Sequence, residues 1–121
     1  MAESIIGIGI DITEVTRLRK AMEKWGDSFA SRIFTPNELS IARSKVNKYQ
    51  HLAGRFAAKE AVFKAAGDPQ IGFKDIEICN DKTGKPYCRF QNGKGKNISI
   101  DVSISHVKTY AVANAIATKK T

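Results

Sequence analysis

The sequence has few of the residues that mark disulfide-stabilised, zinc-binding or membrane proteins. Its 121 residues include only two cysteines and two histidines, and no other candidate ligand lies near either cysteine in a zinc-binding spacing. No apolar run approaches the roughly 20 residues of a membrane-spanning helix, and the first four residues lack the basic start of a signal peptide. We therefore expect one cytoplasmic domain over residues 1–121, without a membrane segment and with reduced cysteines.

Acidic residues are also scarce. Lys and Arg together number 20 against 12 Asp and Glu, which gives a net charge of +8. Such an excess favours an acidic partner, which could be a nucleic acid, a phosphorylated cofactor or an acidic protein surface. Charge alone does not choose among the three.

The first part of the chain predicts a strand followed by helices. Residues 5–11 form an apolar run typical of a buried strand, in which Gly7 and Gly9 indicate a close approach of another backbone. A helix should begin near Glu14 and end at Gly26, with Val15, Leu18, Met22 and Trp25 on its apolar side. A second helix should begin at Thr35 and end near residues 43–44, with Glu38 completing a capping box.

The rest of the chain predicts one long helix and then strands. The helix should span residues 47–66 and end at Gly67. Strands are expected around residues 76–78, 87–90, 98–104 and 110–117, with a hairpin corner at residues 105–109 that contains His106. Residues 91–97 form a polar loop with no assigned role. The expected fold class is α+β: a single domain with an antiparallel sheet and a long central helix.

Charged residues on the long helix point to a site. At 100° per residue, Lys64 lies about 40° from Glu60, and both fall on the side of Ala53, Phe56 and Phe63. Buried charges are costly unless they are paired or bind a metal. The pair could therefore be an ion pair at the edge of the apolar stripe, or part of a site where the stripe meets a cleft.

Asp11 and the other polar candidates each have two interpretations. Asp11 could cap the next helix or act with Glu60 as a Mg²⁺ ligand, because Mg²⁺ takes one or two protein carboxylates and fills its other positions with water and phosphate oxygens. Arg55, Lys59 and Lys64 could be solvated or could bind phosphate. His106 could be only a turn residue.

Several motifs resemble the signatures of the 4′-phosphopantetheinyl transferases. The first is GIGIDITEVTRL at residues 7–18, and the second is LAGRFAAKEAVFKA at residues 52–65. The second is the more specific, because it matches the pattern (W/F)-x-x-K-E-(A/S)-x-x-K-A. Further matches are RIFTPNE at 32–38, GKP at 84–86 and SISH at 103–106 followed by Tyr110-Ala111. They occur in family order from residue 5 to about 113, as in the short, homotrimeric branch.

The resemblance implies a role for each matching residue. The family transfers 4′-phosphopantetheine from coenzyme A (CoA) to a serine of an acyl carrier protein, which supports fatty acid biosynthesis. Asp11 and Glu60 would hold Mg²⁺ (or Mn²⁺), and Lys64 would stabilise the leaving 3′,5′-ADP. Sites would lie between subunits of a homotrimer, and Arg17 would dock the acidic carrier protein. The expected CoA contacts are Arg55, Lys59, Lys64, Gly84, Lys85, Pro86 and His106.

Two other functions compete with this interpretation. A basic nucleic-acid-binding module would explain the net charge, but most aromatic residues fall at core spacings and no RNA-binding signature is present. A transferase with the same chemistry could instead serve the carriers of polyketide or peptide synthases. It would share every catalytic residue, so only kinetics with different carrier proteins would separate the two.

Overall fold

Helix α3 (Lys48–Ala66) is the element against which the rest of the chain packs. The computed structural model describes residues 4–120. Before α3 come β1 (Ile5–Glu14), α1 (Val15–Ile33) and α2 (Pro36–Arg43). After it come a short 3-10 turn (Phe73–Asp75), β2 (Ile76–Asn80), β3 (Pro86–Phe90), β4 (Ile98–His106) and β5 (Tyr110–Lys119). Among these residues, no helix is long and apolar enough to cross a membrane.

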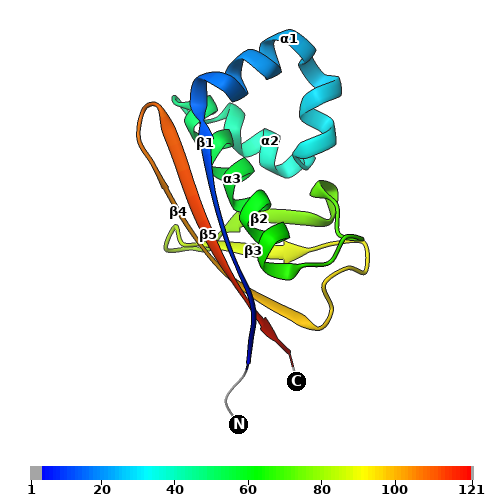
Figure 1. Ribbon diagram of the computed structural model, residues 1–121. Coiled ribbons are helices and arrows are strands. Elements are labelled where there is room, and N and C mark those ends of the chain that lie inside the picture. The colour runs from blue at the N-terminus through cyan, green and yellow to red at the C-terminus, as the bar shows by residue number, and fades with distance from the viewer. Residues whose placement is uncertain (1–3, 121) are drawn as a thin grey trace.

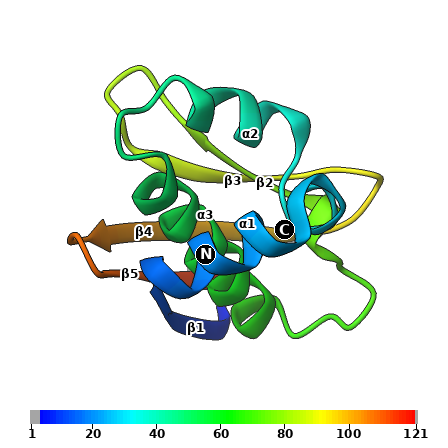
Figure 2. The ribbon, with the colours of Figure 1, turned by 90° about the horizontal axis from the view of Figure 1, so that it is seen from above.

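The strands form two separate antiparallel sheets around α3. One has the order β1-β5-β4, and the other is the β2–β3 hairpin. Figures 1 and 2 show α3 between the hairpin and the three-stranded sheet, with α1 and α2 at one end. The expected α+β class, long helix and antiparallel strands are confirmed, although the strands do not make one continuous sheet. Along β4 the inward Ile98, Ile100, Val102 and Ile104 alternate with polar residues, as their spacing predicts.

Strand β1 lies directly on α3 because two of its core-facing residues are glycines. A Cβ atom built on Gly7 would lie 1.8 Å from the carbonyl oxygen of Ala65, and one on Gly9 would lie 1.9 Å from that of Ala61. Real Cβ atoms do not come so close. The two glycines therefore have the role expected from the sequence: they allow a strand backbone to touch a helix backbone.

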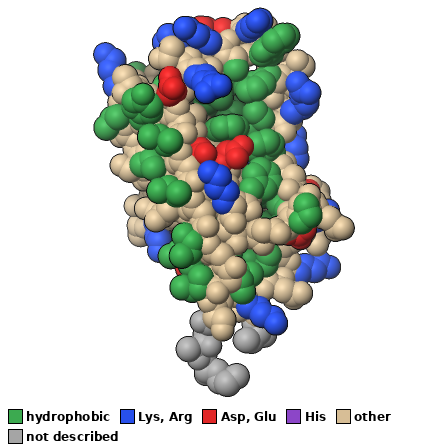
Figure 3. Space-filling model, viewed as in Figure 1, with side chains coloured by type: hydrophobic (Ala, Val, Ile, Leu, Met, Phe, Trp, Pro, Cys, Tyr) green, Lys and Arg blue, Asp and Glu red, His purple; other side chains and the backbone are tan. Residues whose placement is uncertain are grey.

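The apolar run at the start of β1 is not a buried strand in the isolated chain. Glycines occupy the inward positions, so the isoleucines between them point away from α3, and Ile8 is 68% exposed. Ile6, Ile10 and Ile12 are also exposed, and Val112 and Tyr110 of neighbouring β5 extend the same face. Hydrophobic side chains on this side of the molecule are visible in Figure 3. Such a continuous apolar surface is typical of an interaction site.

Helix α1 is longer than the sequence predicts. The expected stop at Gly26 is a local break, where φ is +59°, and helical structure resumes after it and runs to Ile33. Val15 and Leu18 are buried as expected, but Trp25 next to the break is 58% exposed. The apolar spacing therefore predicted the burial of Val15 and Leu18 correctly, but not that of Trp25 in the last turn before the break.

A buried ion pair joins α2 to α3. Thr35 and Glu38 form the expected capping box at the start of α2. Glu38 is itself buried, however, and it accepts a hydrogen bond from the Ile78 backbone amide at 2.8 Å while pairing with Lys59 of α3 at 2.6 Å. Lys59 Nζ also donates to the carbonyl oxygens of Ile33 at 2.7 Å and Phe73 at 3.1 Å. This network ties both earlier helices and β2 to α3.

The contact between β1 and α3 can be tested with Gly9→Ala. The added methyl group should force the strand away from Ala61 and lower the free energy of unfolding by at least about 1–3 kcal/mol, the usual cost of overpacking. Chemical denaturation monitored by circular dichroism measures this loss. Gly72→Ala is a matched control, because its Cβ would meet only the Asp75 carboxylate at 3.6 Å. Equal stability of the two variants would contradict the close contact.

Candidate functional site

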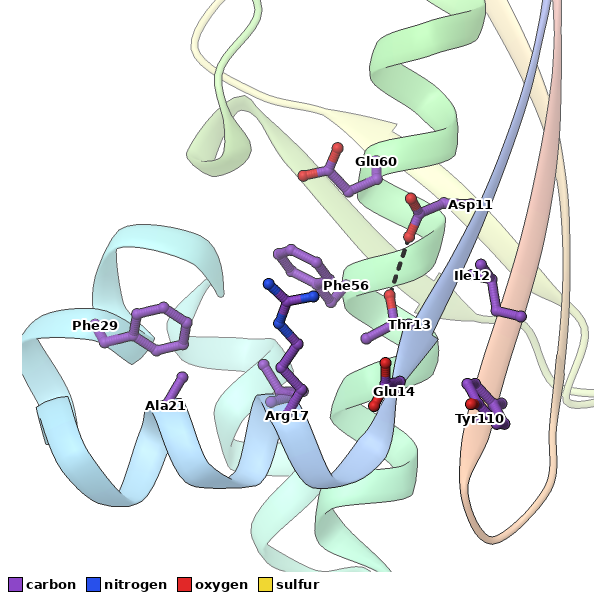
Figure 4. A pocket seen from close by; sticks show the side chains of 11 residues that line it. Asp11, Ile12, Thr13, Glu14, Arg17, Ala21, Phe29, Phe56, Glu60 and Tyr110 are labelled. Atoms are coloured by element: carbon purple, nitrogen blue, oxygen red, sulfur yellow. Dashed lines mark hydrogen bonds between the residues drawn. The ribbon is translucent and has the colours of Figure 1, made fainter.

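Asp11 and Glu60 face the same open cavity of about 680 Å³. Asp11 comes from β1 and Glu60 from α3, and in Figure 4 their carboxylates point into the space beside α1. The remaining wall is provided by side chains of β1, α1, α3 and the start of β5: Ile12, Thr13, Glu14, Arg17, Leu18, Ala21, Phe29, Phe56 and Tyr110. The structure thus brings together two carboxylates that chain spacing alone could not connect.

The backbone contact of β1 with α3 puts the carboxylates side by side. Asp11 follows Gly9 by two residues on the same strand face, and Glu60 precedes Ala61, the residue that Gly9 touches. The Thr13 hydroxyl donates to Asp11 Oδ2 at 3.0 Å, and Lys64 Nζ lies 3.6 Å from Asp11 Oδ1 while donating to the Ile10 carbonyl oxygen at 2.8 Å. Both neighbours hold the Asp11 side chain in place.

Two expectations about these acids need correction. Asp11 does not cap the next helix, because β1 continues to Glu14 and α1 begins only at Val15. Glu60 does not lie on the most buried side of α3 either. Ala58, Ala61, Val62 and Ala65 are buried on the other sides of the helix, whereas Phe56, Glu60, Phe63 and Lys64 are partly or fully exposed. Packing on two sheets buries most of the circumference of α3.

The Glu60 carboxyl is electrostatically unfavourable without a cation. Burial raises its pKa above the ordinary value, the nearby Asp11 charge raises it further, and Lys64 opposes the shift. Two carboxylates from different elements in a solvent-accessible cavity fit a hard divalent cation such as Mg²⁺, which needs no third protein ligand. No cluster of three or more potential metal ligands occurs among residues 4–120, so the geometry does not fit a closed structural zinc site.

Arg17 lies on the wall of this cavity. Its side chain starts from the first turns of α1 and extends toward Phe56, as Figure 4 shows. The residue is exposed, in agreement with its expected position off the apolar side of α1. The wall therefore combines a guanidinium with the rings of Phe29, Phe56 and Tyr110, next to the two carboxylates.

A second, smaller pocket of about 180 Å³ lies elsewhere on the molecule. Arg55 and His106 line it, and the Arg55 guanidinium donates to Asn80 Oδ1 at 2.6 Å. Gly84 and Pro86 of the expected GKP motif also line it, whereas Lys85 between them is exposed and is not part of the lining. The sequence interpretation missed two polar residues of this pocket, Asn80 and His51, and His51 lies one helical turn before Arg55. That spacing, i to i+4 on one helix, was the only available signal.

Lys59 does not have the position expected for a phosphate contact. Its side chain is 0% exposed, and its ammonium group is held by Glu38 and by two backbone carbonyl oxygens. All three of its donors are therefore occupied. Helical geometry explains the difference, because Lys59 lies 100° from Glu60 on α3 and points into the interior while Glu60 points into the cavity.

Comparisons with known proteins agree on one family. The model of the 4′-phosphopantetheinyl transferase superfamily matches residues 7–115. A holo-[acyl-carrier-protein] synthase of Halothermothrix orenii is 45% identical over 117 residues, covering 90% of this chain and 94% of its own length. A crystal structure of such a synthase from Bacillus anthracis, in complex with CoA (3′,5′-ADP), has a TM-score of 0.83 at 39% identity and covers 98% of this chain and 100% of its own. That from Neisseria meningitidis gives 0.86 at 34%, covering 96% and 100%.

The raised pKa of Glu60 predicts a pH-dependent penalty on stability in the presence of a chelator. Because the folded chain binds this proton more tightly than the unfolded chain, stability should fall as pH rises from the ordinary value of 4.5 through the raised pKa. Glu60→Gln should remove that fall and be more stable at neutral pH by on the order of 0.5 kcal/mol, a small value because the site is open to solvent. Urea denaturation of both proteins across this pH range measures the difference. A variant less stable than the wild type at neutral pH would contradict the strained carboxylate pair.

Proposed function

The chain belongs to the 4′-phosphopantetheinyl transferase superfamily, and on this premise we propose how its two pockets serve the family reaction. It acts as a holo-(acyl-carrier-protein) synthase: it transfers 4′-phosphopantetheine from CoA to a serine of an apo-acyl carrier protein, in support of fatty acid biosynthesis. The observation that carries the assignment of the site is the meeting of Asp11 and Glu60 in one cavity. The net charge of +8 fits both substrates, a phosphorylated cofactor and an acidic protein.

The chemistry requires cationic groups around a phosphate. The carrier serine gives its proton to a water molecule of the site, and its oxygen forms a bond to the β-phosphorus of CoA as the bond to the 3′,5′-ADP leaving group breaks. Negative charge grows on the phosphoryl oxygens and on the leaving phosphate, so catalysis depends on positioning and electrostatic stabilisation. Lys64, whose ammonium group is exposed beside Asp11, would stabilise the leaving group.

Asp11 and Glu60 would hold Mg²⁺, with Mn²⁺ as an alternative of similar ligand preference. When bound, the cation would neutralise phosphate charge and orient the CoA diphosphate. The raised pKa of Glu60 supports this assignment, because a bound cation would remove the repulsion between the two carboxylates.

The free cysteines, Cys79 and Cys88, further support action in the cytoplasm.

Mass spectrometry of an apo-acyl carrier protein incubated with the enzyme, CoA and Mg²⁺ tests the function directly. The carrier should gain the mass of one phosphopantetheinyl group.

EDTA should abolish the transfer, and Mg²⁺ or Mn²⁺ should restore it. Asp11→Ala and Glu60→Ala should each lose most of the activity, by at least about 100-fold for a group that acts on the developing charge, while remaining folded. Full activity of either variant at low Mg²⁺ would exclude the metal assignment, and an unmodified carrier would exclude the function. The same assay with polyketide or peptide synthase carriers identifies the preferred partner.

One molecule of CoA would need residues from two subunits. On α3, Glu60 and Arg55 point in directions about 140° apart, so the helix separates the metal site from the second pocket of the same chain. The diphosphate and the 3′-phosphate of CoA are attached to a single ribose ring, whereas a helix with its side chains is about 10 Å wide. A CoA that uses both sites would therefore lie between two chains. The exposed isoleucine face of β1 supports this assembly, and a homotrimer with three such sites is the arrangement we propose.

Subunit mixing tests the shared site. Glu60→Ala removes a proposed metal ligand and Arg55→Ala removes a proposed phosphate ligand, so each variant alone should be nearly inactive. When the two variants are unfolded together and refolded, some interfaces should combine an intact carboxylate pair with an intact Arg55 pocket. About a quarter of the wild-type activity should return if the two chains mix at random, because each site needs one particular chain on each side.

Activity that stays at the level of the separate variants, in samples that light scattering shows to be mixed oligomers, would contradict sharing. A monomer of about 13.3 kDa with full activity would contradict it as well. Wild-type protein mixed with itself by the same procedure is the control for losses during refolding.

Arg17 would receive the carrier protein. It is exposed on the wall of the cavity that holds Asp11 and Glu60, so a carrier bound there would bring its serine close to the metal site. A guanidinium can make bidentate contacts with the carboxylates of an acidic helix. Phe29 and Phe56 beside it supply an apolar surface for the same partner.

Arg17→Glu should raise the KM for the carrier protein by at least about tenfold, because it replaces attraction by repulsion at a close contact. The KM for CoA should stay nearly constant. Lys119→Glu is the matched control: it makes the same charge change at an exposed residue near the end of β5, far from the cavity. Steady-state kinetics with each substrate varied measures both constants. An unchanged carrier KM in Arg17→Glu would remove this residue from the docking surface.

A further inference from the structure

His51 is a polar side chain in the second pocket that the proposed reaction leaves without a task. Among the described residues 4–120, its Nε2 is a buried side-chain nitrogen without a hydrogen-bond partner. A buried polar atom of this kind is rare in folded proteins and asks for an explanation. Its imidazole lines the same pocket as Arg55, His106 and Asn80.

The surroundings of His51 are positively charged. The charged or titratable groups that face it are Arg55 on its own helix, Lys45 before that helix, and His106 at the end of β4. The residues that β2 and the β2–β3 hairpin contribute, Asn80, Gly84 and Pro86, are uncharged. Within the described part of the chain, no carboxylate lines the pocket. His51 is therefore a base without a partner in a pocket that lacks negative charge.

The pocket is suited to one phosphate group. Its volume of about 180 Å³ is below the roughly 300 Å³ at which pockets begin to enclose whole small molecules. In the proposed reaction, the CoA diphosphate is oriented at the metal site of Asp11 and Glu60, which is a different cavity. The phosphate that remains is the 3′-phosphate, a monoester that carries up to two negative charges at neutral pH, since its second pKa is about 6.

We propose that His51 takes up a proton when the 3′-phosphate of CoA enters this pocket and so becomes an additional cationic contact beside Arg55 and His106. The inference rests on the proposed function, in which Arg55 and His106 contact CoA. Binding of the cofactor is then coupled to proton uptake, and part of the preference for CoA over 3′-dephospho-CoA comes from His51.

The electrostatics of the free protein support this coupling. Burial and, to a smaller extent, the charges of Arg55, Lys45 and His106 together lower the pKa of His51 to about 4. The imidazole is therefore neutral at physiological pH before the ligand binds. A phosphate dianion reverses the sign of the local field and supplies an acceptor for a second N–H group, and both effects favour the protonated ring.

Linkage fixes the sign of the expected pH dependence. Between the pKa of the free protein and the higher pKa of the complex, binding takes up a proton, so the dissociation constant for CoA should rise with pH by up to about tenfold per pH unit. The adenosine and diphosphate groups of CoA do not enter the His51 pocket in this proposal, so they do not cause this pH dependence. The 3′-dephospho form of CoA should therefore bind without it.

Calorimetry can count the protons. CoA and 3′-dephospho-CoA are titrated into wild-type protein and His51→Gln in pairs of buffers with different ionisation enthalpies, over about pH 6 to 8, the range in which histidine is switched. Net proton uptake should accompany CoA binding to the wild type and should be lost both in His51→Gln and with the dephospho ligand. Equal uptake by the wild type and His51→Gln would overturn the proposal.

A second measurement follows His51 in the wild-type protein itself and needs the variant only to assign its signals. The chain has only two histidines, so NMR of the ring resonances can follow His51 in the wild type, and His51→Gln identifies its signals. The His51 signals should move to protonated positions when CoA is added at neutral pH. Signals that stay at neutral positions in the saturated complex would overturn the proposal as well.

Carrier modification followed by mass spectrometry on the same preparations separates this inference from the proposed function. Transfer without a change at His51 would refute only the proton uptake. An absence of transfer by the wild-type protein would refute the function on which it rests.

Discussion

The backbone contact between Gly9 of β1 and Ala61 of α3 is the constraint on which the site depends. With no side chain on the strand and only a methyl group on the helix, two backbones approach until their atoms touch. Asp11 and Glu60 are then held next to each other by the strand and the helix on which they lie, and not by loops. The cost of this arrangement falls on the Glu60 carboxyl, because burial and then the neighbouring Asp11 charge raise its pKa. This unfavourable electrostatic energy is expected at a cation-binding site, because a carboxylate pair that the protein itself neutralises would have little affinity for a metal.

Lys59 and Glu60 show how adjacent residues of one motif can divide two tasks. Glu60 points into the cavity, whereas Lys59 points into the interior and joins Glu38, the end of α1 and the 3-10 turn before β2. Removing one partner of such a buried pair leaves an uncompensated charge. The pair therefore fixes where α1 and α2 sit relative to α3. Since Arg17 and Phe29 of α1 line the cavity, a buried lysine that does not line it still determines the shape of the proposed site.

Local chemistry made part of this arrangement predictable from the sequence. Thr35 and Glu38 predict the start of a helix, Gly67 predicts the end of another, and the structure contains both boundaries. Motif spacing also selected Asp11 and Glu60, which share one cavity. The direction in which each side chain points was harder to predict from the sequence. The spacing of apolar residues identifies one side of a helix, but α3 is covered on most sides, so it could not show that Lys59 points inward. His51 has no pattern of its own, and its position opposite His106 depends on the pairing of strands far away in the sequence.

The isoleucines of β1 connect the fold to the assembly. As a sequence, an apolar run without polar alternation indicates a strand covered on both faces, yet α3 covers only one of them in a single chain. The other face keeps Ile8, Ile10 and Ile12 exposed, beside the strand positions that carry Asp11. On α3, the carboxylate cavity and the Arg55 pocket point in opposing directions. If each of these pockets holds part of one CoA, as we propose, the uncovered apolar strand next to Asp11 is suited to a ring in which every subunit completes the site of its neighbour. In that ring, the surface that stabilises the assembly and the surface that completes catalysis would be continuous.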